Sequence, residues 1–269
     1  MLHDKLTHHE PVDGFRWRSH EITRVEGFSD AVFGFAVTLL IVSLEVPRTS
    51  TELFHTMRGF GAFVITFLIL AGIWYAQHTF FRRYGLEDKT TVVLNLVLLF
   101  TVLFFVYPLK FLFGLMVSDP MMKGKIETAH GLELVVLPEH KPWIFVIFAL
   151  GFISMFTVFL LLYRHAYKQR QKLGLNDFEV FETEHSMRRM RLSIVVGVWY
   201  FAVALMNAMP KKTPSEKRLF LAVSLVVMLG FVGMLGMMLK MRSERRRVIQ
   251  EWKERQSGAT VEPPEPGNL

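Results

Sequence analysis

Six apolar stretches separated by charged segments set the pattern of this chain. They fall near residues 25–47, 59–81, 91–117, 142–163, 192–209 and 219–240. Each approaches the roughly 20 residues that a helix needs to cross the hydrocarbon core of a bilayer, although the fifth is short. The pattern therefore predicts an all-α membrane protein with six transmembrane helices.

The composition agrees with a membrane protein and argues against a soluble domain, cysteine chemistry and nucleic-acid binding. The 269 residues are 51% hydrophobic, and a soluble domain of this size could bury a core without so many long apolar runs. The chain has no cysteine, which excludes disulfides, thiolate metal sites and cysteine nucleophiles. Its net charge of +7 fits basic loops beside a membrane, so nucleic acid is not an expected partner.

The distribution of Lys and Arg predicts that both termini are cytoplasmic. With that orientation, about 21 of the 31 basic residues fall on the inner side. The chain then divides into a cytoplasmic tail (1–23), a six-helix membrane domain (24–240), and a basic helix with a disordered tail (241–269). The charged stretch 164–191 becomes an inner segment able to form helix. The basic sequence KMRSERRRVIQEWKER either lies on anionic lipid or is a solvated extension of the last helix.

The first apolar stretch opens with RVEGFSD, which places an aspartate at the membrane boundary. At 100° per residue, Phe35, Leu39 and Val42 form one apolar stripe with Thr38 beside it. Asp30 projects about 140° away from Phe35. Because an ionised group at this depth needs partners, Asp30 is expected to be a buried, paired acid that holds helices together.

The partners are sought on the next two stretches. Trp74 and His78 share one helix face, and Asn95 is a lone amide in an apolar run. Arg24 lies on the side of the stripe, so it reaches Asp30 only if the helix start is distorted. Hydroxyl, carboxylate, indole, imidazole and amide groups could then satisfy one another between helices.

Taken together, these motifs resemble the transmembrane protein 175 family of lysosomal-type potassium channels, in its bacterial six-helix branch. The resemblance rests on Arg-x-x-x-Phe-Ser-Asp followed by TLL and Val-Pro, and it covers about residues 24–110. It continues through Trp74, His78, Phe81, Asn95 and Pro108. It implies a homotetramer in which the first helix lines the pore, without a Thr-Val-Gly-Tyr-Gly filter.

The resemblance also implies roles for particular residues. Phe35, Leu39 and Val42 would form the apolar constriction, and Thr38 the hydroxyl layer that selects ions. The supporting network would comprise Arg24, Phe28, Ser29, Asp30, Trp74, His78 and Asn95. Phe35 departs from the Leu or Ile expected in the family. The implied protein is a potassium-permeable cation channel of the cell membrane, the bacterial inner membrane, with no cofactor or metal, and the sequence leaves open whether protons also permeate.

Other interpretations stay open from the residues alone. A proton-coupled secondary transporter would use Asp30 and His78 as a relay, and a non-conducting membrane protein would use its basic tail to bind a partner. The stripe is also compatible with plain packing, and Thr38 with a hydrogen bond to its own helix. An enzyme is not expected, because the sequence has no phosphate-binding Gly-rich loop, HExxH or G-x-S-x-G motif.

Overall fold

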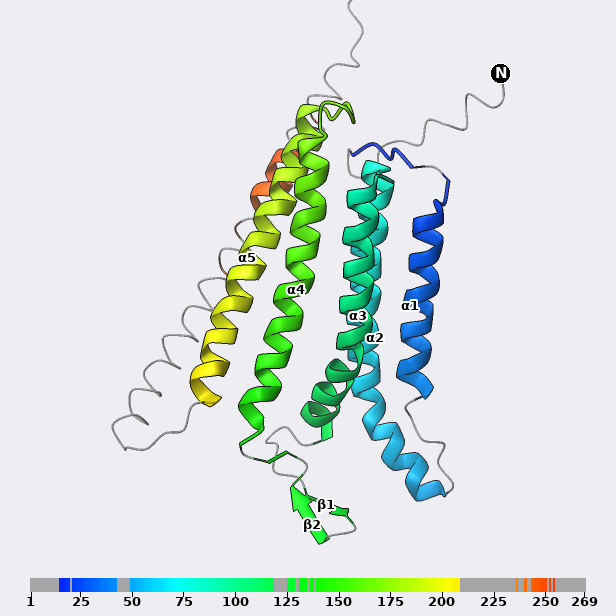
Figure 1. The fold of residues 1–269 in the computed structure, drawn as a ribbon, viewed down its shortest axis with the longest axis vertical. Coiled ribbons are helices and arrows are strands. Elements are labelled where there is room, and N and C mark those ends of the chain that lie inside the picture. Colours follow the sequence, from blue (N-terminus) through cyan, green and yellow to red (C-terminus); the bar gives the residue numbers. More distant parts are fainter. Residues whose placement is uncertain are drawn as a thin grey trace, which may run out of the picture.

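The fold is a bundle of long helices with one small β-hairpin (Figure 1). The computed structural model describes residues 15–19, 21–42, 49–118, 125–128, 131–134, 136–137, 139–208, 236, 240, 243–250, 252 and 254. The elements are α1 (Arg24–Val42), α2 (Ser50–Tyr84), α3 (Lys89–Ser118), β1 (Lys125–Thr128), β2 (Gly131–Leu134), α4 (Lys141–Lys168) and α5 (Asp177–Ala208). A further helical segment covers residues 243–250.

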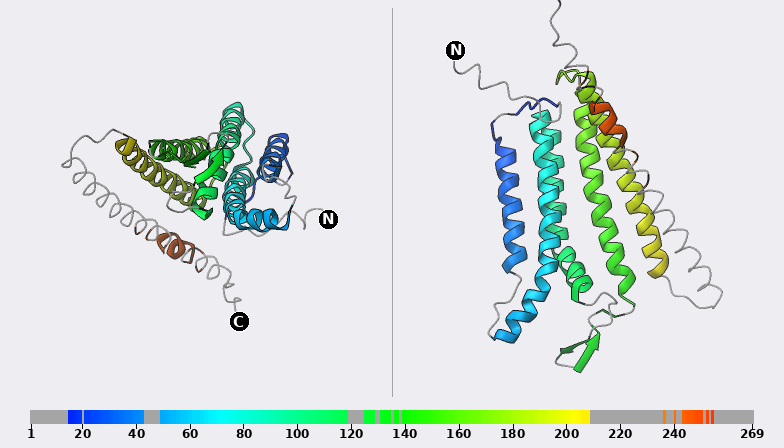
Figure 2. Two further views of the ribbon diagram at one scale, coloured as in Figure 1. Left: turned by 90° about the horizontal axis from the view of Figure 1, so that it is seen from below. Right: turned by 180° about the vertical axis from the view of Figure 1, so that it is seen from behind.

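The helices form two groups. The first helix packs against α2 and α3, α4 pairs with α5, and contacts between α3 and α4 join the two groups (Figures 1 and 2). All five are long and apolar enough to cross a membrane. The sixth predicted stretch, 219–240, falls almost entirely outside the described residues. The sidedness of the termini stays a prediction.

One end of the bundle carries most of the charged contacts, and we call it the charged end. It consists of residues 15–19, the α2–α3 turn and the α4–α5 turn, at the top of Figure 1. The stretch 164–191 is mostly helical there, since only residues 169–176 separate α4 from α5. Asn176 starts α5 with a reciprocal cap: its side chain accepts from the Glu179 amide at 2.8 Å, and the Glu179 carboxylate accepts from the Asn176 amide at 3.0 Å.

The helical class of the membrane bundle is as predicted, with one small β-hairpin added to it. Its two antiparallel strands pair Lys125 with Leu134 and Thr128 with Gly131 at the end of the bundle opposite the charged end (Figure 1). The sequence prediction rests on apolar runs of about 20 residues, and strands of four residues form no such run. The hairpin lies in the connection between α3 and α4.

Close packing between helices depends on small residues at two positions. A Cβ added at Gly151 of α4 would overlap the ring of Phe105 on α3, and one at Gly197 of α5 would come within 2.7 Å of Ile153. Glycine lets helix backbones approach each other in this way in membrane bundles. These contacts fix the spacing of α3, α4 and α5, and therefore the frame against which α1 is held.

Candidate pore helix and its polar supports

The first helix has one packed face and one uncovered face. The buried side chains Glu26, Ser29, Phe33, Ala36 and Leu40 recur every three or four residues and face α2 and α3. Phe28, Phe35 and Val42 lie on another side and are 53%, 58% and 71% exposed. Because these exposed side chains are large and apolar, this face suits contact with lipid or with other copies of the chain.

The start of α1 is fixed by a capping box. The Glu26 carboxylate accepts from the Thr23 amide at 3.0 Å, and the Thr23 hydroxyl accepts from the Glu26 amide at 3.1 Å. The second carboxylate oxygen of Glu26 lies 3.7 Å from Nε of Arg82, near the end of α2. Both side chains are largely buried, so this ion pair ties the start of α1 to the end of α2.

A chain of buried hydrogen bonds joins the three N-terminal helices. The Gln77 amide of α2 donates to the Asn95 carbonyl oxygen of α3 at 3.0 Å. The Asn95 amide in turn donates to the Ser29 hydroxyl at 2.8 Å, and that hydroxyl donates to the Val25 carbonyl. All three side chains are at most 1% exposed. Because buried polar groups need partners and these hydrogen bonds link three helices, this chain fixes the rotation of α1 about its own axis.

A second contact holds the acidic residue of the motif. The indole nitrogen of Trp74 donates to a carboxylate oxygen of Asp30 at 2.7 Å, and the Trp74 ring stacks on His78 with centroids 5.5 Å apart. Asp30 is thus paired across helices, but it is exposed in the single chain, whereas the sequence suggested a buried acid. A shallow apolar pocket of about 340 Å³ lies beside it between α1 and α2.

The residues expected to line a pore lie together along α1. Phe35, Thr38 and Val42 are exposed, and Leu39 is half-buried. The Thr38 hydroxyl donates to the Gly34 carbonyl at 2.9 Å. This is the hydrogen bond to its own helix that the sequence analysis gave as the alternative for Thr38. This bond uses the hydroxyl proton and leaves acceptor capacity on the oxygen.

The residues predicted to form one supporting network fall into two separate clusters, and two of them belong to neither. Ser29 and Asn95 belong to one cluster, while Asp30, Trp74 and His78 form another. Arg24 and Phe28 are exposed, and Arg24 makes no polar contact with any other described residue. Sequence reasoning missed Gln77 and the Glu26–Arg82 pair. Gln77 could have been noticed because, like Asn95, it is an amide within an apolar run.

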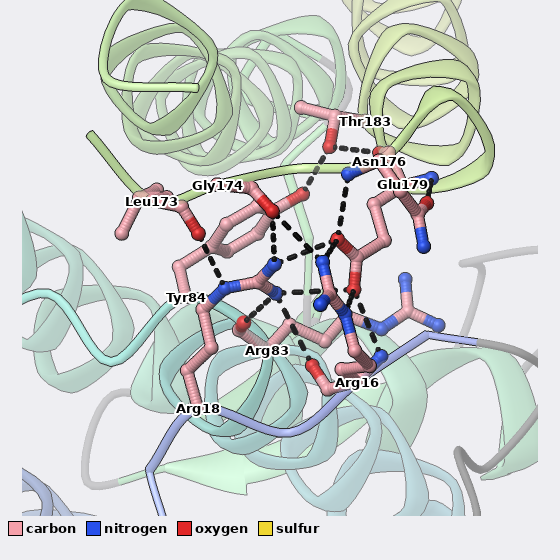
Figure 3. A network of polar contacts seen from close by, with 9 residues as sticks. All are labelled: Arg16, Arg18, Arg83, Tyr84, Leu173, Gly174, Asn176, Glu179 and Thr183. Carbon is pink, nitrogen blue, oxygen red and sulfur yellow. Dashed lines mark hydrogen bonds and ion pairs between the residues drawn. The ribbon is translucent and has the colours of Figure 1, made fainter. Parts of the chain in front are cut away.

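At the charged end, residues 15–19 precede α1 and reach α5, where Arg16 and Arg18 surround Glu179 (Figure 3). The buried Glu179 carboxylate accepts from Arg16 at 3.0 and 3.1 Å and from Arg18 at 2.6 and 3.2 Å. Arg18 also donates to the Leu173 carbonyl at 3.0 Å, and its amide donates to the Arg82 carbonyl at 2.9 Å. We call Arg16, Arg18 and Glu179 the N-terminal clasp. Glu179 raises the pKa of Arg16 through its hydrogen bond and its charge.

The segment after residue 240 also contacts α5. Arg245 donates to the Glu182 carboxylate at 2.8 Å, and Arg83 of α2 lies 3.9 Å from the same group. The Trp252 ring stacks on Phe178 with centroids 4.6 Å apart. Two carboxylates three positions apart on α5 therefore hold the two terminal segments of the chain.

Together, these features define a multi-pass helical membrane protein. Large apolar side chains stay exposed along its helices, among them Leu68, Phe100 and Tyr107 at 62%, 68% and 65%. Patches of this kind are expected where lipid or another subunit covers the surface. Its first helix is held on one face by polar contacts and left uncovered on the other.

The comparisons with known proteins place this chain in a family. The model of the endosomal/lysosomal potassium channel TMEM175 matches residues 24–105. A potassium channel of Marivirga tractuosa is 39% identical over 184 residues, which cover 64% of this chain and 70% of that protein. A potassium channel of Streptomyces collinus is 35% identical over 89 residues, 31% of this chain and 43% of that protein.

A solved structure agrees with this placement. The crystal structure of a threonine-to-alanine variant of the potassium channel MtTMEM175, in complex with a nanobody–MBP fusion, superposes with a TM-score of 0.68. The two sequences are 31% identical, and the match covers 86% of this chain and 97% of the MtTMEM175 chain. This protein belongs to the TMEM175 family.

The buried hydrogen-bond chain leads to a first prediction. Replacing Asn95 by leucine should destabilise the protein by about 1–3 kcal/mol, because Ser29 and Gln77 would lose their shared partner while staying buried. The thermal unfolding midpoint in detergent measures the effect. Thr90→Leu serves as the control, since Thr90 is exposed on the same helix. Equal midpoints for Asn95→Leu and Thr90→Leu would contradict the role of Asn95.

Proposed function

We propose that this protein is a potassium channel of the cell membrane whose pore is lined by α1 in a homotetramer. The observation that carries the proposal is the asymmetry of α1. Ser29 and Glu26 fix its inner face, while Phe35, Thr38 and Val42 are left uncovered along the other side. Membership of a family of potassium channels supports potassium as the ion.

Rings of apolar side chains would control permeation. In a symmetric assembly about α1, each of Phe35, Leu39 and Val42 becomes a ring, and such a constriction blocks ions when it is dry. The proposed role of Thr38 is to offer hydroxyl lone pairs between two of these rings, because its proton is already donated to Gly34. Potassium and protons would pass with their hydration largely kept.

Orientation and location belong to the same proposal. The Lys and Arg bias supports an orientation with the charged end in the cytoplasm of a bacterial cell and the membrane domain 24–240 in the inner membrane. The constriction at the Val42 end of α1 would then lie toward the outer side. Lys110 supports this end of the helix, donating to the Leu40 carbonyl at 3.1 Å.

The transporter alternative has less support. A proton relay through Asp30 and His78 needs a path between groups that exchange protons. The observed partner of Asp30 is an indole N–H, and His78 contacts that indole by stacking. An indole donates a hydrogen bond but does not accept the proton that a relay would pass on.

The test is potassium flux through the purified protein in liposomes, with Thr38→Ala and Leu39→Ala alongside. A current at zero proton gradient that reverses at the potassium equilibrium potential is expected. Thr38→Ala should lower the preference for K⁺ over Na⁺ by about fivefold, as expected for roughly 1 kcal/mol from a lost oxygen. Flux that saturates and requires a proton gradient would identify a carrier instead.

A further inference from the structure

A cleft lies between α5 and the helical segment 243–250 at the charged end. It encloses about 660 Å³, with Tyr167 of α4 and Glu244 of the C-terminal segment contributing to its walls. The α5 wall carries Glu184, His185, Arg188 and Arg191. This volume is within the range of small-molecule sites, so the cleft has room for a headgroup-sized ligand.

The guanidinium groups of the two arginines of this wall have no polar partner among the described residues. Arg188 and Arg191 are three residues apart and therefore share a helix face. Neither forms an ion pair with any described residue, whereas the nearby Arg83 and Arg245 both engage Glu182. Of the cleft carboxylates, Glu184 accepts from the Tyr167 hydroxyl at 2.6 Å, and Glu244 is exposed on the opposite wall. Within the described part of the chain, the α5 wall thus presents two guanidinium groups without an ion-pair partner.

The position of the two arginines along α5 indicates that an anion bound there would belong to a lipid. Arg191 directly precedes the apolar part of α5, which begins at residue 192. Val195 and Val198, just beyond it, are 59% and 50% exposed. A guanidinium at this boundary lies at the depth of lipid phosphates, while the exposed valines suit acyl chains.

We propose that this cleft binds the phosphate group of an anionic phospholipid, with Arg188 and Arg191 as its donors. Guanidinium groups match phosphate oxygens in charge and in geometry. The site differs from the lipid contact expected on the basic tail, because Arg245 of that tail is already bound to Glu182. It does not depend on conduction, so its test is independent of the proposed channel.

The experiment titrates short-chain phosphatidylglycerol into the full-length protein in neutral detergent and counts bound lipids by native mass spectrometry. Arg188→Gln with Arg191→Gln should weaken binding about 25-fold, from roughly fivefold for each cation. Arg246→Gln with Arg247→Gln is the matched control, since it removes two exposed charges of the C-terminal segment that do not line the cleft. The control should weaken binding less than about threefold.

Equal weakening in both double variants would show diffuse attraction and overturn the proposal, as would binding that survives in the cleft variant. Arg188→Lys with Arg191→Lys keeps the charge and should restore part of the affinity, which excludes simple unfolding. Inorganic phosphate and phosphatidylcholine form the remaining arms. If inorganic phosphate displaces phosphatidylglycerol and binds as tightly as that lipid does, the phosphate site is supported but its ligand is a soluble one. If phosphatidylcholine binds as tightly as phosphatidylglycerol, the proposal is overturned.

Discussion

Replacing Glu179 by alanine is expected to lower the free energy of unfolding by about 3 kcal/mol. Its carboxylate is fully buried and accepts hydrogen bonds from Arg16, Arg18 and Asn176. Removing one partner of a buried pair typically costs 3–5 kcal/mol, and the lower figure applies because Arg16 is half exposed. The midpoint of thermal unfolding in detergent should fall accordingly.

Two controls separate the charge of Glu179 from its other contacts. Glu179→Gln keeps the shape but weakens the attraction to Arg16 and Arg18, so an intermediate loss is expected. Glu184→Ala removes an exposed carboxylate from the same helix together with its solvent-exposed hydrogen bond from Tyr167, and should lower the midpoint far less. A midpoint for Glu179→Ala that matches Glu184→Ala would show that the clasp does not stabilise the bundle.

Replacing Phe35 by asparagine is expected to raise potassium flux in liposomes by about tenfold or more. A dry apolar ring blocks water and ions, and a barrier lower by about 1.4 kcal/mol already gives a factor of ten. The exposed position of Phe35 on the uncovered face makes the substitution compatible with folding. The effect is measured as the initial rate of potassium efflux.

Phe104→Asn is the matched control for this experiment. Phe104 is 60% exposed but lies on α3, a different helix from the proposed pore wall. Its substitution should leave flux unchanged, because the proposed pore does not involve α3. An increase with Phe104→Asn and none with Phe35→Asn would move the pore wall from α1 to α3.

Apolar length alone predicted the main helices, but not the details at their ends. The first four stretches overlap α1 to α4, since a run of about 20 apolar residues leaves few alternatives in a membrane, although α2 begins at Ser50 rather than near 59. The fifth begins at Asp177 rather than near 192, because a polar, capped helix can continue beyond the hydrocarbon core. The hairpin at 125–134 depends on local pairing that apolar length cannot register.

Contacts within one helix could be predicted better than contacts between helices. Helix geometry placed Asp30 away from Phe35, and the structure joins Asp30 to Trp74 of a neighbouring helix. Gln77 and His78 are adjacent and point about 100° apart, so the rotation of α2 decides which of them meets Asn95. That rotation results from packing along the whole bundle and is not encoded by spacing on one helix.

The wide sequence separation within the N-terminal clasp has a consequence for synthesis. Arg16 and Glu179 are 163 residues apart. At about 5–20 residues per second, Glu179 leaves the ribosome on the order of 10–30 s after its partner. During that interval, the residues that join the first three helices, among them Ser29, Asn95 and Gln77, have already been made. Docking of residues 15–19 on Glu179 is therefore a late step of biogenesis, which has to wait until the start of α5 has been made.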